Sequence, residues 1–435
     1  MKKVTVIGAG LAGCEAACQL SRRGINVDLI EMKPKKKSPA HKIDNFAELV
    51  CSNSLKASRV DSAAGLLKEE MRRFGSVCLE AADKCSVAAG GALAVDRDIF
   101  SSLITEKIKN DPNINIISEI ATDIPKDGIT IIATGPLTDG ELSEKIAEYT
   151  GENNLSFFDA AAPIVTAESV NMDIAFTASR YGKGTDDYIN CPMNKEEYEA
   201  FYKELISAES APVKDFDKPI NVYEGCMPVE VLAKRGEDSI RFGPLKPVGL
   251  RDPRTGNRPW AVVQLRRENS EGSLYNLVGF QTNLKFPEQK RVFSMIPGLE
   301  NAEFMRFGVM HRNSFINSPK LLNRNLSLKL GGNIFFAGQL SGVEGYMESA
   351  ASGIIAGINA AKLLLGEEEL ILPDYSMIGA LLKYICDPSV ENFQPMGANF
   401  GILPPLDTKI RDKRERYSAL ANRSLEWFDS NIKEF

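Results

Sequence analysis

Apolar runs alternate with segments of helical character along the first third of the chain. Residues 4–7 form a short apolar run that leads into a glycine-rich turn, and residues 11–23 follow with the pattern of a helix. A second apolar run at 27–31 completes the order strand, helix, strand. The same alternation predicts a helix over 99–108 and strands over 114–117 and 129–133. This order is typical of a parallel α/β sheet.

The pattern changes from about residue 165. A helix is expected over 195–206, and turn-rich, basic segments with strand character follow at 261–265 and 274–280. The strand-then-helix pattern returns only at 333–337 and 347–365, where alanine and glycine would allow close packing on a sheet. We therefore expect a Rossmann-like, doubly wound α/β domain interrupted by a smaller α+β insertion. The expected parts are residues 1–165, the insertion 166–310, and residues 311–435.

The composition and charge are those of an ordinary soluble protein. The 435 residues are 43% hydrophobic and 25% charged, with a net charge of −6. No apolar run approaches the ~20 residues that span a bilayer, and the first strand begins too early to leave room for a signal peptide. We expect a cytoplasmic protein without membrane contact, whose eight cysteines are reduced thiols. None forms Cys-x-x-Cys and only two histidines exist, so no metal site is expected.

The turn after the first strand is a dinucleotide-binding loop. Gly8 supplies the tight turn, Gly10 lets the backbone approach a pyrophosphate, and Gly13 lets helix and strand pack closely. The helix that follows directs its amide protons and positive dipole end at the phosphates. Glu31, at the end of the second strand, is placed to accept from ribose hydroxyls. The expected nucleotide-binding residues of this half are Gly8, Ala9, Gly10, Leu11, Ala12, Gly13 and Glu31.

Glycines far along the chain favour FAD over NAD as the bound nucleotide. A strand ends in one small-residue turn at 133–135, and another such turn starts the helix after 338. Such two-part cradles are typical of flavoproteins, where they close around the ribityl chain and the isoalloxazine. No second Gly-x-Gly-x-x-Gly exists, so a nicotinamide cofactor has no Rossmann domain of its own. The expected residues of the second half are Ala133, Thr134, Gly135, Gly338, Gln339, Gly345 and Tyr346.

Two cysteines stand in segments with loop character. Cys51 lies in Glu-Leu-Val-Cys-Ser-Asn-Ser, and Cys226 lies in Tyr-Glu-Gly-Cys-Met-Pro, where glycine and proline favour an exposed turn. For both, a reactive thiol and a structural thiol are equally good interpretations of the context. The remaining cysteines lack such a pattern, and the role of Cys191 stays open.

One basic stretch is a candidate for contact with phosphates. Residues 246–267 carry many lysines and arginines against the single acid Asp252, whereas the basic segment 409–416 reads as a solvated face. The expected phosphate contacts are Arg251, Arg254, Arg258, Arg266 and Arg267.

Several of these motifs occur together in one known family. Further shared segments are Phe-Gly-Pro-Leu-Lys-Pro-Val-Gly-Leu at 242–250, Val-Gly-Phe-Gln-Thr at 278–282, Met-His-Arg-Asn at 310–313 and Ala-Gly-Gln-Leu-Ser-Gly-Val-Glu-Gly-Tyr at 337–346. Over essentially its whole length the chain resembles the bacterial folate- and FAD-dependent tRNA uracil-5-methyltransferases.

The resemblance implies a reaction and roles for particular residues. Cys226 would add to C6 of the uracil, which makes C5 nucleophilic, and Cys51 would remove the C5 proton. His311 would stack on the pterin, and Tyr346 would cover the isoalloxazine when substrate is absent. The implied cofactor is FAD, the carbon comes from 5,10-methylenetetrahydrofolate, and NAD(P)H supplies the electrons. The implied partner is the T-arm of tRNA, without an obligatory protein partner. Whether the carbon passes through flavin N5 stays open.

Four other functions remain as alternatives. The same chemistry could act on a uridine of ribosomal RNA, as in relatives from some reduced-genome bacteria. The larger wobble-uridine-modifying tRNA flavoproteins share the closing glycine motifs but are longer and work with a GTPase. The third alternative is a plain NADPH:flavin oxidase or a thiol–disulfide oxidoreductase. That activity would need a close pair of redox-active cysteines, which the cysteine spacing does not offer. An RNA-binding module with a vestigial flavin is the fourth, and both motif cysteines argue against it.

Overall fold

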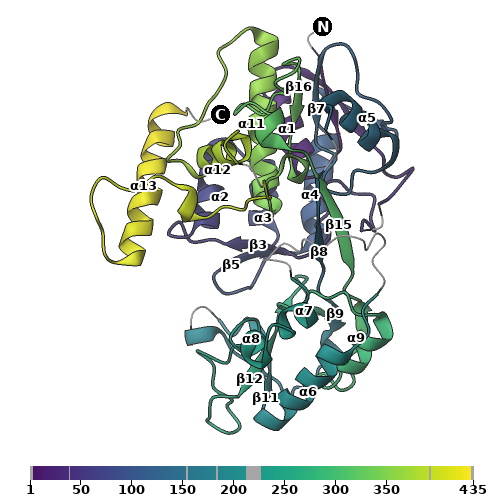
Figure 1. Cartoon of the computed structure of the whole chain (residues 1–435), viewed down its shortest axis with the longest axis vertical. Coiled ribbons are helices and arrows are strands. Elements are labelled where there is room, and N and C mark those ends of the chain that lie inside the picture. Colours follow the sequence, from purple (N-terminus) through teal and green to yellow (C-terminus); the bar gives the residue numbers. More distant parts are fainter. Residues whose placement is uncertain are drawn as a thin grey trace.

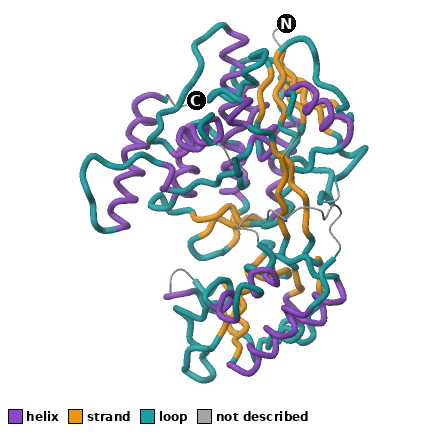
Figure 2. The backbone as a smooth tube through the Cα atoms, viewed as in Figure 1, coloured by secondary structure: helices purple, strands orange, loops and turns teal. Residues whose placement is uncertain are grey.

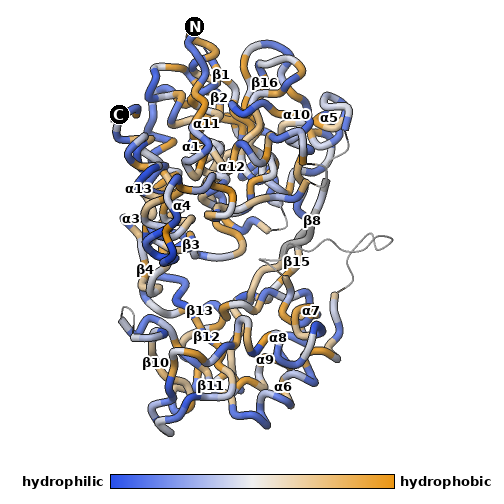
Figure 3. The backbone as a smooth tube through the Cα atoms, turned by 60° about the vertical axis from the view of Figure 1, so that its left-hand side comes forward, coloured by the Kyte–Doolittle hydropathy of each residue, from blue (hydrophilic) through white to orange (hydrophobic). Residues whose placement is uncertain are grey.

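Two bodies of unequal size lie one above the other in the computed structural model (Figure 1). The structure describes residues 3–38, 40–152, 155–182, 185–211, 227–390 and 393–432. Each body has its own hydrophobic core, and apolar segments gather inside both (Figure 3). The larger core draws on both ends of the chain and the smaller one on residues 162–304. The division at residues 165 and 310 itself stays a prediction.

A five-stranded parallel sheet forms the centre of the larger body. Its strand order is β16-β7-β1-β2-β6, with parallel pairing throughout. Val4, Val6 and Ile131 are fully buried, as expected for strands covered on both faces. The strands expected in this body are thereby confirmed, and β16 brings the far end of the chain beside β7. The strands are β1 (Lys3–Ile7), β2 (Asn26–Glu31), β6 (Ile114–Ser118), β7 (Ile129–Ile132) and β16 (Ile334–Phe336).

Two helices rich in small residues pack against each other beside this sheet (Figure 1). They are α1 (Leu11–Ser21) and α11 (Tyr346–Leu365). A Cβ atom added to Gly353 would lie 2.2 Å from the carbonyl oxygen of Ala12, so only glycine permits this approach. The expected packing of α11 on the sheet is confirmed by its contacts with β7 and β16, and α11 also packs closely against α1. The small residues of α11 therefore bring it onto the helix that follows the nucleotide loop.

The remaining elements of the larger body surround this centre. Helix α4, expected at 99–108, is confirmed, and a small sheet of order β3-β5-β4 lies at the lower edge (Figure 1). The helices are α2 (Ala63–Arg73), α3 (Val77–Lys84), α4 (Arg97–Lys109), α5 (Gly140–Thr150), α10 (Ser318–Leu321), α12 (Met377–Cys386) and α13 (Lys413–Asn431). The strands of the small sheet are β3 (Ser54–Ala57), β4 (Ser86–Val87) and β5 (Ala92–Val95).

The smaller body contains a six-stranded antiparallel sheet of order β10-β11-β12-β13-β9-β14. The helix and strands expected here are confirmed, although β13 ends at Leu277. The strands are β9 (Ile164–Thr166), β10 (Phe176–Thr177), β11 (Tyr188–Met193), β12 (Ala261–Arg267), β13 (Leu274–Leu277) and β14 (Phe304–Arg306). The helices are α6 (Lys195–Ser207), α7 (Val229–Ala233), α8 (Glu237–Arg241) and α9 (Phe286–Phe293).

A two-stranded antiparallel ribbon connects the bodies. It consists of β8 (Leu155–Ala160) and β15 (Met310–Phe315), which run between the bodies in Figures 1 and 2. Both crossings between the bodies that the described residues show lie in this ribbon, as expected for a smaller body inserted into the larger one. None of the helices in the described part of the chain is long and apolar enough to cross a membrane.

Candidate active site

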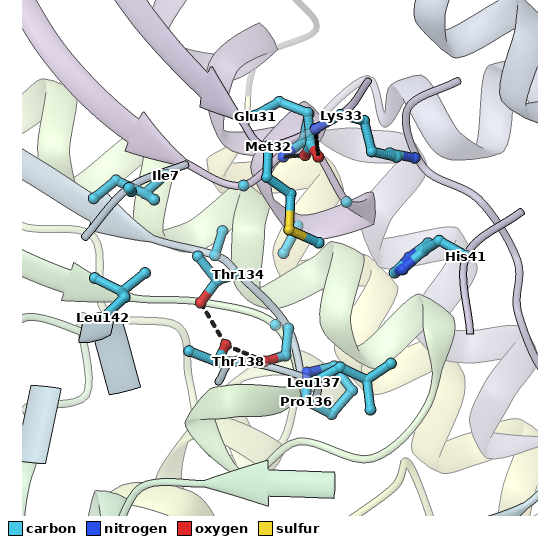
Figure 4. A pocket seen from close by; sticks show the side chains of 18 of the residues that line it. Ile7, Glu31, Met32, Lys33, His41, Thr134, Pro136, Leu137, Thr138 and Leu142 are labelled. Carbon is cyan, nitrogen blue, oxygen red and sulfur yellow. Dashed lines mark hydrogen bonds between the residues drawn. The ribbon is translucent and has the colours of Figure 1, made fainter. Parts of the chain in front are cut away.

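A cavity of about 470 Å³ opens where the strand order of the parallel sheet reverses. The carboxyl ends of β1, β2 and β7 border it, and this is where open α/β sheets bind their ligands. Glu31 and Lys33 lie on one side of it, with Thr134 and Thr138 on the other (Figure 4). The expected residues that line it are Gly8, Ala9, Gly10, Leu11, Ala12, Glu31, Ala133, Thr134, Gly135, Gly338, Gln339 and Tyr346, and Cys51 lines it too.

The glycines of the first loop have different surroundings. A Cβ atom on Gly8 would lie 2.6 Å from the carbonyl oxygen of Ala133, and one on Gly13 would lie 1.8 Å from the carbonyl oxygen of Gly8. These two glycines permit the tight turn and close packing. By contrast, no atom lies within 4 Å of a Cβ built on Gly10, which lines the cavity. The space beside Gly10 is open, as the approach of a pyrophosphate requires.

Glu31 connects the second strand to the glycine loop. Its carboxylate accepts from the backbone nitrogen of Ala9 at 2.7 Å and from that of Lys33 at 3.0 Å. An ionised carboxylate has about four lone-pair sites, so both oxygens can accept further hydrogen bonds. Together with the open side of Gly10 and the N-terminus of α1, this donor and acceptor set fits the ribose and phosphates of a dinucleotide such as FAD.

Two residues on the rim of the cavity were not expected from the sequence. Lys33 is buried and donates from Nζ to the carbonyl oxygen of Asn45. His41 Nδ1 lies 2.6 Å from Ser38 Oγ, and burial lowers the pKa of its imidazole to about 4, so the ring is neutral at pH 7. In the sequence both residues belong to the lysine-rich loop after β2, and this loop carries no recognisable motif that would have marked them as site residues.

Cys51 and Tyr346 meet at the wall of the cavity. The backbone nitrogens of Cys51 and Ser52 donate to the Tyr346 hydroxyl oxygen at 2.8 and 3.2 Å. The same oxygen lies 3.1 Å from Cys51 Sγ. Burial, followed by the charge of Cys51, raises the pKa of Tyr346 well above its usual value, so the hydroxyl keeps its proton. Because two amides already occupy its lone pairs, that proton is directed to the sulfur, which favours the thiolate.

Three arginines hold the chain on both sides of Cys51. Arg97 of α4 donates to the carbonyl oxygen of Leu49 at 3.0 Å, and Arg306 of β14 donates to that of Val50. Arg266 of β12 donates to Ser52 Oγ at 2.8 Å and to Asn53 Oδ1 at 3.1 Å. Two of these arginines belong to the smaller body, so the position of the Cys51 segment depends on how the bodies contact each other.

A buried carboxylate balances part of this positive charge. Glu268 Oε2 lies 2.7 Å from Arg97 Nε, and Glu268 is 4% exposed. Burial alone would disfavour the charged guanidinium, but the carboxylate raises the pKa of Arg97 overall, so the ion pair stays charged. Three guanidinium groups against one carboxylate leave an excess of positive charge beside Cys51, which also favours a thiolate.

The arginines expected to contact phosphates occupy different environments. Arg251, Arg254 and Arg258 are exposed, and Arg254 pairs with Asp252 at 2.7 Å. Arg266, in contrast, is buried and bonded to the Cys51 segment, so in this structure it is not available to a phosphate. Arg267 is partly buried, and its carbonyl oxygen accepts from Asn53.

Two expected site residues fall outside what the structure describes. Cys226 lies outside the described residues, whose next range begins at Met227. For His311 the structure describes the backbone in β15, paired with Asp159, while its side chain lies outside the described part. Asn313, two residues further along the strand, lines the cavity.

The described residues offer no site for a metal ion. Over the described ranges, no group of three or more histidine, cysteine or acidic side chains could hold a metal ion. The seven described cysteines are free thiols, and Cys14, Cys18 and Cys191 are fully or almost fully buried. Burial raises the pKa of Cys191 to about 12, which suits a structural thiol.

Comparison with known proteins gives consistent results. The family profile described as "Glucose inhibited division protein A" matches residues 3–368. "Methylenetetrahydrofolate--tRNA-(uracil-5-)-methyltransferase TrmFO" of Acetivibrio thermocellus is 61% identical over 432 residues, which cover 99% of each chain. The proteins of the same name from Lactobacillus johnsonii and Enterococcus faecalis are each 58% identical, covering 98% of this chain and 97% of theirs.

Solved structures share the fold at low sequence identity. Aquifex aeolicus GidA in its form I crystal superposes with a TM-score of 0.70 at 18% identity, covering 98% of this chain and 75% of that one. Its form II crystal gives a TM-score of 0.68 at 17% identity, covering 98% and 73%. These similarities confirm the Rossmann-like fold expected from the sequence.

Proposed function

The chain belongs to the family of methylenetetrahydrofolate--tRNA-(uracil-5-)-methyltransferases. We propose that it transfers a one-carbon unit from methylenetetrahydrofolate to C5 of a tRNA uridine by means of two cysteine thiols and bound FAD. The enzyme class follows from the family, and the residue roles below are the proposal. Relatives with 61% and 58% identity over nearly the whole chain support it.

Two thiols act on the uracil, Cys226 as the nucleophile and Cys51 as the base. The thiolate of Cys226 adds to C6, and the resulting enolate makes C5 nucleophilic. C5 then bonds to the one-carbon unit. Cys51 takes the C5 proton while the bond between that carbon and its carrier nitrogen breaks, which leaves an exocyclic methylene on C5. Once two electrons and a proton have turned this methylene into a methyl group, the Cys226 thiolate leaves C6. The position of Cys51 on the cavity wall and the positive charge of Arg97 and Arg306 near it support its role as base.

FAD is the cofactor that the cavity fits. Gly10 and the N-terminus of α1 would hold its phosphates, Glu31 its ribose, and Thr134, Gly338 and Gln339 would border the rest. When bound and reduced by NAD(P)H, it supplies the electrons that turn the transferred carbon into a methyl group. Tyr346, at the start of α11, would close the cavity against water while it keeps its bond to Cys51.

Folate and RNA approach from the side of the smaller body. His311 and Asn313 lie in the connecting ribbon, so a pterin near His311 would be next to the cavity that Asn313 lines. Arg251, Arg254 and Arg258 remain our proposed phosphate contacts because they are exposed. The target uridine has to leave its stack to reach both thiols. We propose the T-arm of tRNA as the binding region.

The hydrogen bond between Tyr346 and Cys51 is the observation that carries this proposal, because it places a stabilised thiol in the wall of a dinucleotide cavity. The test is methylation of an unmodified tRNA transcript by the purified protein with methylenetetrahydrofolate and NADPH, read by nucleoside mass spectrometry. We expect 5-methyluridine that depends on folate and not on S-adenosylmethionine. Methylation of ribosomal RNA in place of tRNA would transfer the same chemistry to the alternative substrate.

A further inference from the structure

Three phenylalanine rings in the smaller body form a nearly parallel, offset stack. The ring centroids of Phe286 and Phe307 are 4.9 Å apart at an interplanar angle of 14°. Those of Phe307 and Phe304 are 5.3 Å apart at 10°. An offset parallel stack is one of the two arrangements that aromatic pairs prefer, and here it extends over three rings. We call these three residues the phenylalanine ladder.

The ladder runs from the core of the smaller body to its surface. Phe304, at one end, packs against the hydrophobic core of this body. Phe307 is in the middle and partly buried, and Phe286, at the other end, is 50% exposed. Within the described part of the chain, no further aromatic ring stacks on Phe286. Because Phe286 ends an ordered stack, its exposed face can stack against a further flat ring from a ligand.

The surrounding structure fixes the ladder in place. Phe286 is the first residue of helix α9 and Pro287 the second, and the proline ring limits the backbone there. The buried side chain of Gln289 donates to the carbonyl oxygen of Gly308 and accepts from its nitrogen, both at 2.8 Å. Because these bonds tie α9 to the chain after Phe307, the rings are ordered before any ligand arrives, and stacking on them costs little conformational entropy.

The ladder lies close to the segment that carries Cys51. Arg306, between Phe304 and Phe307 in sequence, donates to the carbonyl oxygen of Val50, beside Cys51. The nitrogen of Val229, at the start of α7, donates to the carbonyl oxygen of Gln281 at 2.7 Å. Gln281 precedes Phe286 by five residues, so this bond ties α7 to the segment that leads into the ladder.

Charges near the exposed ring are largely paired. Lys285 forms an ion pair with Glu209, and Arg291 forms one with Glu288 at 2.8 Å. Such a neutral surrounding does not favour a phosphate. It suits the face of a nucleobase, because every base offers a flat ring for stacking without needing a charge.

We propose that the phenylalanine ladder is a stacking site for an unpaired nucleobase of the RNA, next to the uridine that is methylated. This inference rests on the proposed function: a uridine flipped toward Cys226 leaves its neighbour without a stacking partner. Phe286 supplies that partner and thereby holds the RNA in the opened conformation.

The test compares Phe286→Ala and Phe286→Trp with the control Tyr149→Ala in the FAD-loaded protein. Tyr149 is 47% exposed on α5 of the larger body, so it matches the exposure of Phe286 away from the ladder. For each variant, the Kd for a tRNA transcript, the KM for tRNA and the KM for methylenetetrahydrofolate are measured, with flavin content as the check of folding.

We expect Phe286→Ala to raise the Kd and KM for tRNA about ten-fold, with the folate KM unchanged. Phe286→Trp and Tyr149→Ala should both keep the tRNA affinity of the unmodified protein. Unchanged tRNA binding by Phe286→Ala, or a rise in the folate KM alone, would overturn the inference. The Kd is measured without turnover, so the two claims can fail separately. A protein that binds tRNA through Phe286 but methylates none would contradict the proposed function and still support base stacking on the ladder.

Discussion

The hydroxyl oxygen of Tyr346 lies 3.1 Å from the sulfur of Cys51 and 2.8 Å from the backbone nitrogen of the same residue. One side chain therefore fixes both the backbone and the thiol of a residue 295 positions away in the sequence. Tyr346 is also the first residue of helix α11, whose packing on α1 sets its place beside the glycine loop. The thiol is thus held relative to the cofactor cavity through two helices.

Removing this hydroxyl should slow turnover. Tyr346→Phe keeps the ring but deletes the donor to Cys51 Sγ and the acceptor for two amides. Hydrogen bonds to charged groups contribute about 1.5–3 kcal/mol, so we expect kcat to fall roughly ten- to hundred-fold. Flavin content and the KM for tRNA should change little. An unchanged kcat, measured in steady state, would show that Cys51 does not depend on Tyr346.

The glycine loop should separate cofactor binding from folding. Gly10→Ala adds a methyl group where no protein atom lies within 4 Å, whereas in Gly13→Ala the methyl would meet the carbonyl oxygen of Gly8 at 1.8 Å. We expect Gly10→Ala to keep the Tm of the flavin-free protein and lose FAD, because its methyl enters the ligand space. Gly13→Ala should lower that Tm. Flavin-to-protein ratio and thermal unfolding measure the two effects, and full FAD occupancy in Gly10→Ala would contradict the assignment of the loop.

Arg258 and Arg266 should respond differently to substitution. Arg258 is exposed, so as a phosphate contact its change to alanine should weaken tRNA binding and reduce the slope of log K against log salt by about one. Arg266 is buried against Ser52 and Asn53, so Arg266→Ala should leave that slope intact and lower kcat. Binding titrations at several salt concentrations distinguish them. A reduced slope in Arg266→Ala would show that this side chain reaches the RNA.

The stability of the flavin-free protein should fall in mild acid because of His41. Burial lowers the pKa of this imidazole to about 4, below the ~6.5 of an unfolded histidine, so the unfolded chain binds the proton more readily. The resulting stability is complete above the unfolded pKa and is lost as pH falls through the window from about 6.5 to 4. His41→Gln, which can still bond to Ser38, should show a smaller drop in Tm between pH 7 and pH 5. Equal drops in both proteins would remove His41 as the cause.

Local signals carried much of the fold. The glycine spacing and apolar runs predicted β1, α1, β2 and β16, because in each of these elements the apolar positions of the sequence are the buried positions of the structure. The small sheet around β5 was not predicted, since its strands have two to four residues and depend on contacts far away in sequence. Segments this short leave no periodicity to detect.

The site was predictable where a motif is local and not where the chain folds back on itself. Cys51 and Tyr346 were each expected at the site, but nothing in either motif indicated their hydrogen bond. Arg97 and Arg306 were missed, because an arginine that bonds a distant carbonyl group has no local pattern. Arg266 was expected at the surface on account of its basic neighbours, whereas β12 is buried on both faces from Ala261 to Arg266.

The division of roles between the two cysteines is the central claim, and trapping of a 5-fluorouridine tRNA tests it most directly. Fluorine at C5 cannot be removed as a proton, so an adduct at C6 persists and is seen as a protein–RNA complex on a denaturing gel. We predict that Cys51→Ala still forms this complex but releases no 5-methyluridine from normal tRNA, while Cys226→Ala forms no complex. A complex with Cys226→Ala, or full turnover by Cys51→Ala, would contradict the account.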